Sequence, residues 1–112
     1  VPVIVQQYNS GEVLMLAWMN KDALTETLKK GSICYYSRSR NSLWYKGEQS
    51  GQTQELKDLR IDCDGDTILL QVEQTGVACH TGRQNCFFNA VRDDKVQIIE
   101  KIKIQPKDLY RK

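Results

Sequence analysis

The first third of the chain combines strand-like and helix-like spacing of its apolar residues. Residues 3–5 begin a short apolar strand, and residues 9–11 have the composition of a turn. Residues 13–19 form a mostly apolar run, which predicts a strand buried on both faces. Asn20 can then cap a helix that ends at Gly31, because asparagine favours helix starts and glycine favours helix ends. The apolar face of this helix is expected to contain Ala23, Leu24, Thr27 and Leu28.

The rest of the chain has mainly the spacing of strands. Residues 33–37 are β-branched and aromatic, which is typical of a strand. Residues 56–62 and 67–73 alternate apolar and polar positions on either side of the turn dipeptide Asp64-Gly65, so together they predict a hairpin. Residues 85–91 are a further candidate strand.

The pattern as a whole predicts one small α+β domain. Residues 95–104 alternate only weakly, so helix and strand both remain open for that segment. Because strands outnumber helices, we predict an α+β fold with a mainly antiparallel β-sheet and one or two helices. The 112 residues contain no internal repeat or linker, so we expect a single domain spanning residues 1–112.

Composition and charge narrow the class of protein. The chain is 40% hydrophobic and 27% charged, as in ordinary globular proteins. Its net charge of +2 disfavours a nucleic-acid binder. No apolar run approaches the roughly 20 residues that span a bilayer, and no export signal is visible, so we expect a cytoplasmic protein without a membrane partner. In that compartment its four cysteines are expected to be reduced and free to bind metal.

Three aspartates occur at alternate positions in the turn between the two hairpin strands. Asp62, Asp64 and Asp66 repel one another, and a hard divalent cation with a preference for oxygen would neutralise them. A solvated turn is the alternative, because aspartate and glycine favour turns. A calcium loop would require Glu73 as its last ligand, but Glu73 lies in a predicted strand. Magnesium is therefore the predicted ion.

Three of the four cysteines lie among polar residues and are candidate zinc ligands. The spacing of Cys63, Cys79 and Cys86 is not that of a zinc ribbon, which uses two close pairs. Three thiolates with one open position suit a catalytic zinc instead, although each cysteine can also be a small buried residue. We favour burial for Cys34, which lies in a predicted apolar strand. His80, the only histidine, directly follows Cys79 and is a candidate general acid and base.

The segment of residues 38–51 is predicted to be a loop with a short element at residues 43–45. It mixes cations, hydroxyl groups and aromatic rings, and arginine is the preferred residue for bidentate phosphate contacts. The tryptophan of this segment can stack on a base or fill the core, and we favour the core. The candidate substrate-binding residues are Arg38, Arg40, Trp44, Lys46 and Ser50.

Several of these segments resemble the motifs of the phosphoribosyl-AMP cyclohydrolase family. The matching segments are residues 12–20 (EVLMLAWMN), 36–40 (YSRSR), 43–48 (LWYKGE), 50–51 (SG), 62–66 (DCDGD) and 76–82 (GVACHTG). The resemblance runs from about residue 2 to residue 91. One departure is Asn85, which stands where the family leads us to expect serine.

The resemblance implies hydrolysis of the N1–C6 bond in the adenine ring of phosphoribosyl-AMP, a step of histidine biosynthesis. It implies zinc on Cys63, Cys79 and Cys86, and magnesium on Asp62, Asp64 and Asp66. It further implies an intertwined homodimer in which Cys63 from one subunit completes the zinc site of the other. Many bacterial relatives carry a second, pyrophosphohydrolase domain after this one, and we expect none in these 112 residues.

Two other classes of zinc protein remain as alternatives. A non-catalytic zinc- or calcium-binding structural module would use the same ligands without any reaction. A zinc deaminase would require a His/Cys-x-Glu segment followed by Cys-x-x-Cys, and the chain contains no such run.

Overall fold

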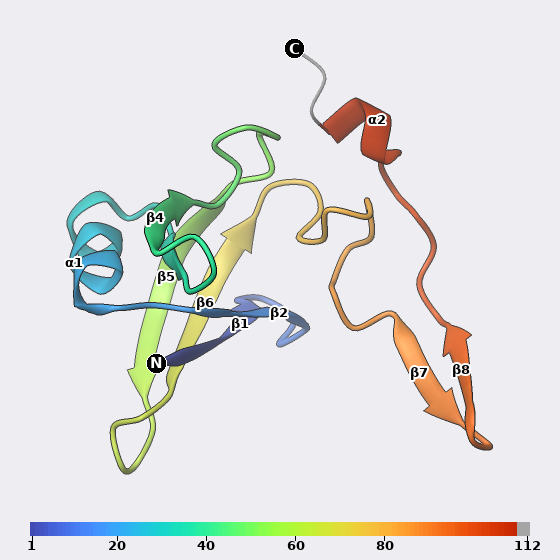
Figure 1. Cartoon of the computed structure of the whole chain (residues 1–112), viewed down its shortest axis with the longest axis horizontal. Coiled ribbons are helices and arrows are strands. Elements are labelled where there is room, and N and C mark those ends of the chain that lie inside the picture. Colours follow the sequence, from blue (N-terminus) through green and yellow to red (C-terminus); the bar gives the residue numbers. More distant parts are fainter. Residues whose placement is uncertain (110–112) are drawn as a thin grey trace.

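The computed structural model describes residues 1–109, and Figure 1 shows their arrangement. In this part of the chain the elements are β1 (Pro2–Gln7), β2 (Val13–Trp18), α1 (Lys21–Lys30), β3 (Cys34–Ser37), β4 (Ser42–Tyr45), β5 (Gln54–Ile61), β6 (Ile68–Gln74), β7 (Asn89–Arg92), β8 (Lys95–Ile98) and α2 (Pro106–Leu109). The fold is mostly β-sheet with two helices within these residues, which confirms the predicted class. No helix in the described part of the chain is both long and apolar enough to cross a bilayer.

The main sheet has four strands in the order β2-β1-β6-β5. Its outer pairs are antiparallel, but β1 and β6 pair in parallel, with Val3 opposite Ile68 and Val5 opposite Leu70. These four side chains belong to one core cluster of buried residues. The predicted hairpin is confirmed as β5 and β6, and its turn contains the aspartates.

The helix α1 begins and ends where its capping residues predict. The side chain of Asn20 accepts a hydrogen bond from the backbone N–H of Ala23 at 2.8 Å, and Gly31 ends the helix with a left-handed φ of 75°. Ala23 and Thr27 are buried, whereas Leu28 is 60% exposed. The predicted apolar face was therefore wrong at Leu28, because α1 packs against β3 with the side of the helix that carries Thr27.

Two other expectations required correction, and one predicted short element is confirmed as a strand. The second face of β2 is not fully covered, since Leu16 is half exposed while Met15 and Ala17 on the opposite face are buried. The short element predicted at residues 43–45 is confirmed as the strand β4, which pairs with β3. The candidate strand at residues 85–91 begins only at Asn89, and β8 occupies the first part of the segment left open at residues 95–104.

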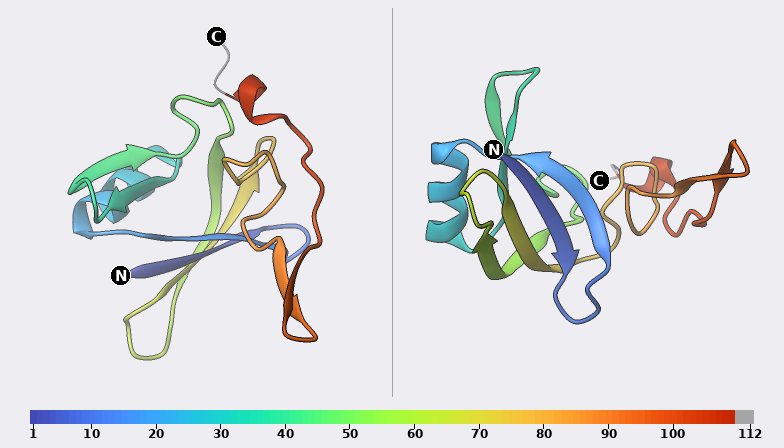
Figure 2. Two further views of the ribbon diagram at one scale, coloured as in Figure 1. Left: turned by 45° about the vertical axis from the view of Figure 1, so that its right-hand side comes forward. Right: turned by 90° about the horizontal axis from the view of Figure 1, so that it is seen from below.

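The hairpin of β7 and β8 projects away from the body of the molecule. Figure 2 shows this orange and red segment to one side of the main sheet. Val91 and Val96 lie opposite each other in the pairing of the two strands, and both are largely exposed, as is Ile98 on the same face. This apolar hairpin face therefore lies outside the core cluster of buried residues.

Candidate active site

Residues 76–86, here called the cysteine loop, follow β6 and carry Cys79, His80 and Cys86. Two distant side chains, Gln52 and Lys46, and one at the end of β6, Gln74, hold the start of the loop. The backbone N–H of Val77 donates to Gln52 Oε1 at 3.0 Å, and Gln74 Nε2 donates to the carbonyl of Val77 at 3.3 Å. Lys46 Nζ donates to the carbonyl of Ala78 at 2.6 Å. The path of the loop is therefore fixed by Gln74 at the end of β6 and by Lys46 and Gln52 from the segment between β4 and β5.

The two cysteines of this loop lie together. Burial raises the pKa of the Cys86 thiol to about 12, with further contributions from the charge of Cys79 and a hydrogen bond to it, while the ammonium group of Lys46 opposes them. Cys79 is 4% exposed, and its sulfur lies 3.0 Å from the hydroxyl of Thr81. The adjacent sulfurs of Cys79 and Cys86 fit the donor preference of zinc and could supply two of the four ligands of a tetrahedral site.

Cys63 does not join these two sulfurs within one chain. It is exposed in the turn between β5 and β6. In residues 1–109, the only group of three or more histidine, cysteine or carboxylate side chains with ligand atoms within 4.8 Å of one another consists of Asp62, Asp64 and Asp66. A zinc site with all three sulfurs therefore requires a second source of Cys63.

The aspartate turn, residues 62–66, is closed by its own backbone. Asp62 Oδ1 accepts hydrogen bonds from the backbone N–H groups of Asp66 at 2.9 Å and Thr67 at 3.1 Å. The pKa of Asp64 is raised by hydrogen bonds to Asp62 and Asp66 and by the negative charge of Asp62. The three carboxylates are exposed and converge, and their oxygen donors fit magnesium.

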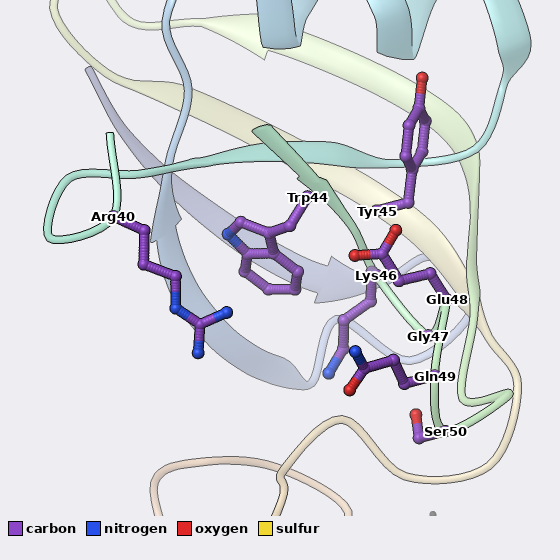
Figure 3. Close-up of a pocket in the computed structure, with 8 residues that line it drawn as sticks. All are labelled: Arg40, Trp44, Tyr45, Lys46, Gly47, Glu48, Gln49 and Ser50. Carbon is purple, nitrogen blue, oxygen red and sulfur yellow. The ribbon is translucent and has the colours of Figure 1, made fainter. Parts of the chain in front are cut away.

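A pocket beside β4 collects four of the five predicted substrate-binding residues, as Figure 3 shows. Its lining includes Arg40, Trp44, Lys46 and Ser50. In this view, the charged ends of Arg40 and Lys46 lie on either side of the Trp44 indole. The arrangement offers a ring surface with a cation to each side, which suits a base with attached phosphate groups.

The fifth predicted residue, Arg38, lies outside that lining. Its guanidinium carbon is 3.6 Å from the ring centre of Trp18 on β2, so the cation stacks on this ring. Trp44 packs against buried Tyr35 with ring centres 5.0 Å apart, as the favoured position against the core predicts, and it also lines the pocket. Tyr45, the next residue, points to the other side of β4 and donates to Glu26 on α1.

Lys46 connects the pocket and the cysteine loop. Its pKa is lowered by burial, while the nearby Cys86 and Cys79 act in the opposite direction. Since its ammonium group already bonds to the loop carbonyl of Ala78, Lys46 is part of the frame that places the sulfurs beside the pocket.

His80 and Cys34 lie in contrasting environments, one exposed and one buried. His80 is exposed, although the preceding Cys79 is buried, so the two side chains face different surroundings. Cys34 is completely buried in the core, and its backbone N–H donates to Thr27 Oγ1 at 2.9 Å. The prediction of a core position for Cys34 is confirmed.

Sequence reasoning missed the buried amides that support the site. Gln54 is 1% exposed and Gln74 is 7% exposed, and Gln54 Nε2 donates to Gln74 Oε1 at 2.8 Å. The hydroxyl of Tyr35 donates to Gln54 Oε1 at 2.5 Å. Gln54 and Gln74 face each other only because β5 and β6 pair in this register, so no local pattern marks them in the sequence.

Comparison with known proteins finds the same family over most of the chain. The family model of phosphoribosyl-AMP cyclohydrolase matches residues 15–88, which include both the aspartate turn and the cysteine loop. A phosphoribosyl-AMP cyclohydrolase of Alkalilimnicola ehrlichii is 60% identical over 100% of this chain and 79% of the relative. Proteins of the same name from Paramagnetospirillum magneticum and Rhodospirillum rubrum are 58% and 61% identical, over 100% and 98% of this chain and 85% and 78% of the relatives.

Proposed function

The chain belongs to the phosphoribosyl-AMP cyclohydrolase family, whose enzymes serve a step of histidine biosynthesis, and we propose that it cleaves the N1–C6 bond of the adenine ring with a zinc-activated water. The observation that carries this proposal is the adjacent pair Cys79 and Cys86 beside the aromatic and cationic pocket. A cytoplasmic enzyme fits the free thiols of all four cysteines.

Zinc would be held by Cys79, Cys86 and Cys63 of the partner subunit. Bound there, it would lower the pKa of a water molecule and supply a hydroxide nucleophile at neutral pH. Three thiolates donate much negative charge, so the ion is a weaker Lewis acid than one held by three neutral imidazoles, and a nearby base is needed.

The remaining residues would bind the substrate and move protons. His80 would accept the proton of the water and return it to the departing ring nitrogen. Arg40 and Lys46 would attract the phosphate groups, and the Trp44 ring would lie against the base. Magnesium on the aspartate turn would neutralise further phosphate charge. Fixing both ends of the substrate makes the attack on C6 effectively intramolecular.

A second copy of the chain is the partner that the surface favours. Each subunit exposes Cys63 in its aspartate turn and also exposes the apolar hairpin face of Val91, Val96 and Ile98. Contiguous exposed apolar side chains mark interaction sites in soluble proteins. A homodimer would cover this face and bring in the third sulfur at the same time, which no unrelated partner would do.

The reaction is tested by ultraviolet monitoring of phosphoribosyl-AMP ring opening, with and without a zinc chelator. We expect turnover by the loaded protein and none after chelation, with recovery on adding zinc back. His80→Ala should keep zinc and lower turnover by about 10²-fold or more. A protein that unfolds on chelation but never opens the ring would instead be a structural metal module.

Complementation tests the shared zinc site. Cys63→Ser and Cys79→Ser homodimers should each be inactive, because every site lacks a sulfur. Mixing the two subunits gives heterodimers with one intact and one doubly broken site, so random mixing should restore about a quarter of the activity. Activity of the Cys63→Ser protein alone, or no recovery on mixing, would contradict the shared site.

A further inference from the structure

Asn85 precedes the candidate ligand Cys86, and its side chain bonds both to Glu12 and to the backbone of Phe87, the residue after Cys86. Asn85 is 7% exposed, and its Nδ2 donates to Glu12 Oε2 at 2.8 Å. Its Oδ1 accepts a hydrogen bond from the backbone N–H of Phe87 at 2.8 Å. The amide therefore ties the residues directly before and directly after Cys86 to one another and to Glu12.

The same end of β2 also holds the backbone of Cys86. The N–H of Cys86 donates to the carbonyl of Leu14 at 2.7 Å, and Leu14 is two residues after Glu12. Because β2 pairs with β1 in the main sheet, these bonds connect Cys86 to the core. Residues 85–88 have no helix or strand of their own, and Phe87 is 54% exposed. Further backbone bonds flank this segment, from the N–H of Ala78 to the carbonyl of Gln84 and from the N–H of Ile99 to the carbonyl of Phe88.

We infer that Asn85 and Glu12 form a positioning bridge that sets the direction of the Cys86 sulfur toward the metal. This inference rests on the proposed zinc site. A carboxylate acceptor makes the Asn85–Glu12 bond stronger than a neutral one. A serine at position 85 can still accept from the N–H of Phe87 but is too short to replace the amide that reaches Glu12. The bridge belongs to the outer contacts that orient metal ligands.

A double-mutant cycle on zinc affinity tests the bridge. The variants are Asn85→Ser, Glu12→Ala and the double variant, and Glu12→Gln is the matched control because its amide oxygen can still accept from Asn85. Zinc affinity is measured by competition with a chromogenic chelator, without substrate. We expect each single variant to weaken zinc binding by about tenfold and the double variant to be no weaker than either.

Glu12→Gln should stay within about threefold of the parent protein. The visible spectrum of the cobalt-loaded protein gives a second measurement, since the sulfur–cobalt bands should change in the two single variants and remain unchanged in Glu12→Gln. A difference confined to folding would not produce this pattern. Melting temperatures of the metal-free variants show whether each is folded, and Glu12→Ala keeps the backbone bond from the Gln7 N–H to the Glu12 carbonyl.

Two results would overturn the bridge. One is unchanged zinc affinity in Asn85→Ser and Glu12→Ala while the parent protein binds zinc tightly, which would leave the proposed function intact. The other is a loss in the double variant equal to the product of the single losses, because independent residues behave in that way. A parent protein that binds no zinc would overturn the proposed function and the bridge together.

Discussion

The aspartate turn and the cysteine loop both gather candidate metal ligands, but they are built in opposite ways. In the turn, Asp62 accepts hydrogen bonds from residues four and five positions later, so the six consecutive residues 62–67 shape the site. In the loop, two of the supports, Lys46 and Gln52, come from a distant segment, and the third, Gln74, is the last residue of β6. The turn is a local structure on the surface, whereas the loop depends on the packing of the whole sheet. Changes to the loop should therefore cost more than matched changes to the turn.

The largest difference between the loop and the turn is expected in the free energy of unfolding when a glycine of each is replaced by alanine. Gly82 in the cysteine loop has a φ of 86°, and a Cβ there would overlap the carbonyl oxygen of Ile104. Gly82 also accepts backbone bonds from Lys103 and Ile104. Gly82→Ala should lower the free energy of unfolding by about 3 kcal/mol, from left-handed strain and two lost hydrogen bonds. Urea denaturation of the metal-free protein measures this change.

The matched control is Gly65→Ala in the aspartate turn. Gly65 has a φ of 78°, but a Cβ there meets nothing within 4 Å. Only the backbone strain remains, so the expected loss is about 1 kcal/mol. Equal losses at the two glycines would show that the loop tolerates change as well as the turn does.

The two candidate metal sites should also differ in their response to pH. The pKa of Cys86 is raised to about 12, so its thiol keeps a proton at neutral pH and zinc must displace it. Apparent zinc affinity should therefore rise by about tenfold per pH unit for this proton between about pH 6.5 and 8.5. Chelator competition at several pH values measures the slope.

Magnesium affinity should be nearly constant over the same range, because ordinary carboxyl groups ionise in the acid range. Calorimetric titration of the protein with magnesium measures the affinity of the site formed by Asp62, Asp64 and Asp66 and provides this comparison. A zinc affinity that does not change with pH would contradict a protonated Cys86 thiol in the metal-free protein.

The smallest effect is expected from Asp64→Asn. The pKa of Asp64 is raised in the folded protein, so its stabilising contribution is present in acid and is lost as pH rises through that pKa. At neutral pH its ionised form therefore opposes folding. The variant should raise the metal-free melting temperature slightly and abolish any further rise on adding magnesium.

Asp58→Asn is the control for this substitution. Asp58 is another exposed carboxylate on β5, but it pairs with Arg60 at 2.9 Å rather than with other acids. Asp58→Asn should leave the melting temperature unchanged or slightly lower, and magnesium should still raise it. A melting temperature that falls equally in both variants would contradict repulsion within the aspartate turn.

The same contrast explains how much the sequence could predict. Asn20 and Gly31 cap α1 through contacts within a few residues, and Asp64-Gly65 closes the β5–β6 hairpin, so these elements were predicted correctly. The parallel pairing of β1 with β6 joins segments more than 60 residues apart, and no local pattern encodes it. The short element predicted at residues 43–45 is the strand β4, but its pairing with β3 could not be predicted, because polar, glycine-rich residues surround it.

The candidate site shows the same division between local and distant information. The ligand types could be predicted, because the aspartates and Cys79 with His80 stand in recognisable local motifs. The supports could not, since Glu12 reaches Asn85 only after β2 has taken its place at the edge of the sheet. Similarly, Arg38 and Arg40 look alike in the sequence, yet one stacks on Trp18 and the other lines the pocket.

The stacking of Arg38 on Trp18 should affect the intrinsic fluorescence of the protein. An indole beneath a guanidinium group has a different emission from one in water, so intrinsic fluorescence would follow the opening of the β3–β4 hairpin away from β2. Trp44, on the pocket side of β4, would respond instead to an arriving nucleotide. With Trp18 and Trp44 as its two tryptophans, the chain carries one optical probe for hairpin movement and one for ligand entry.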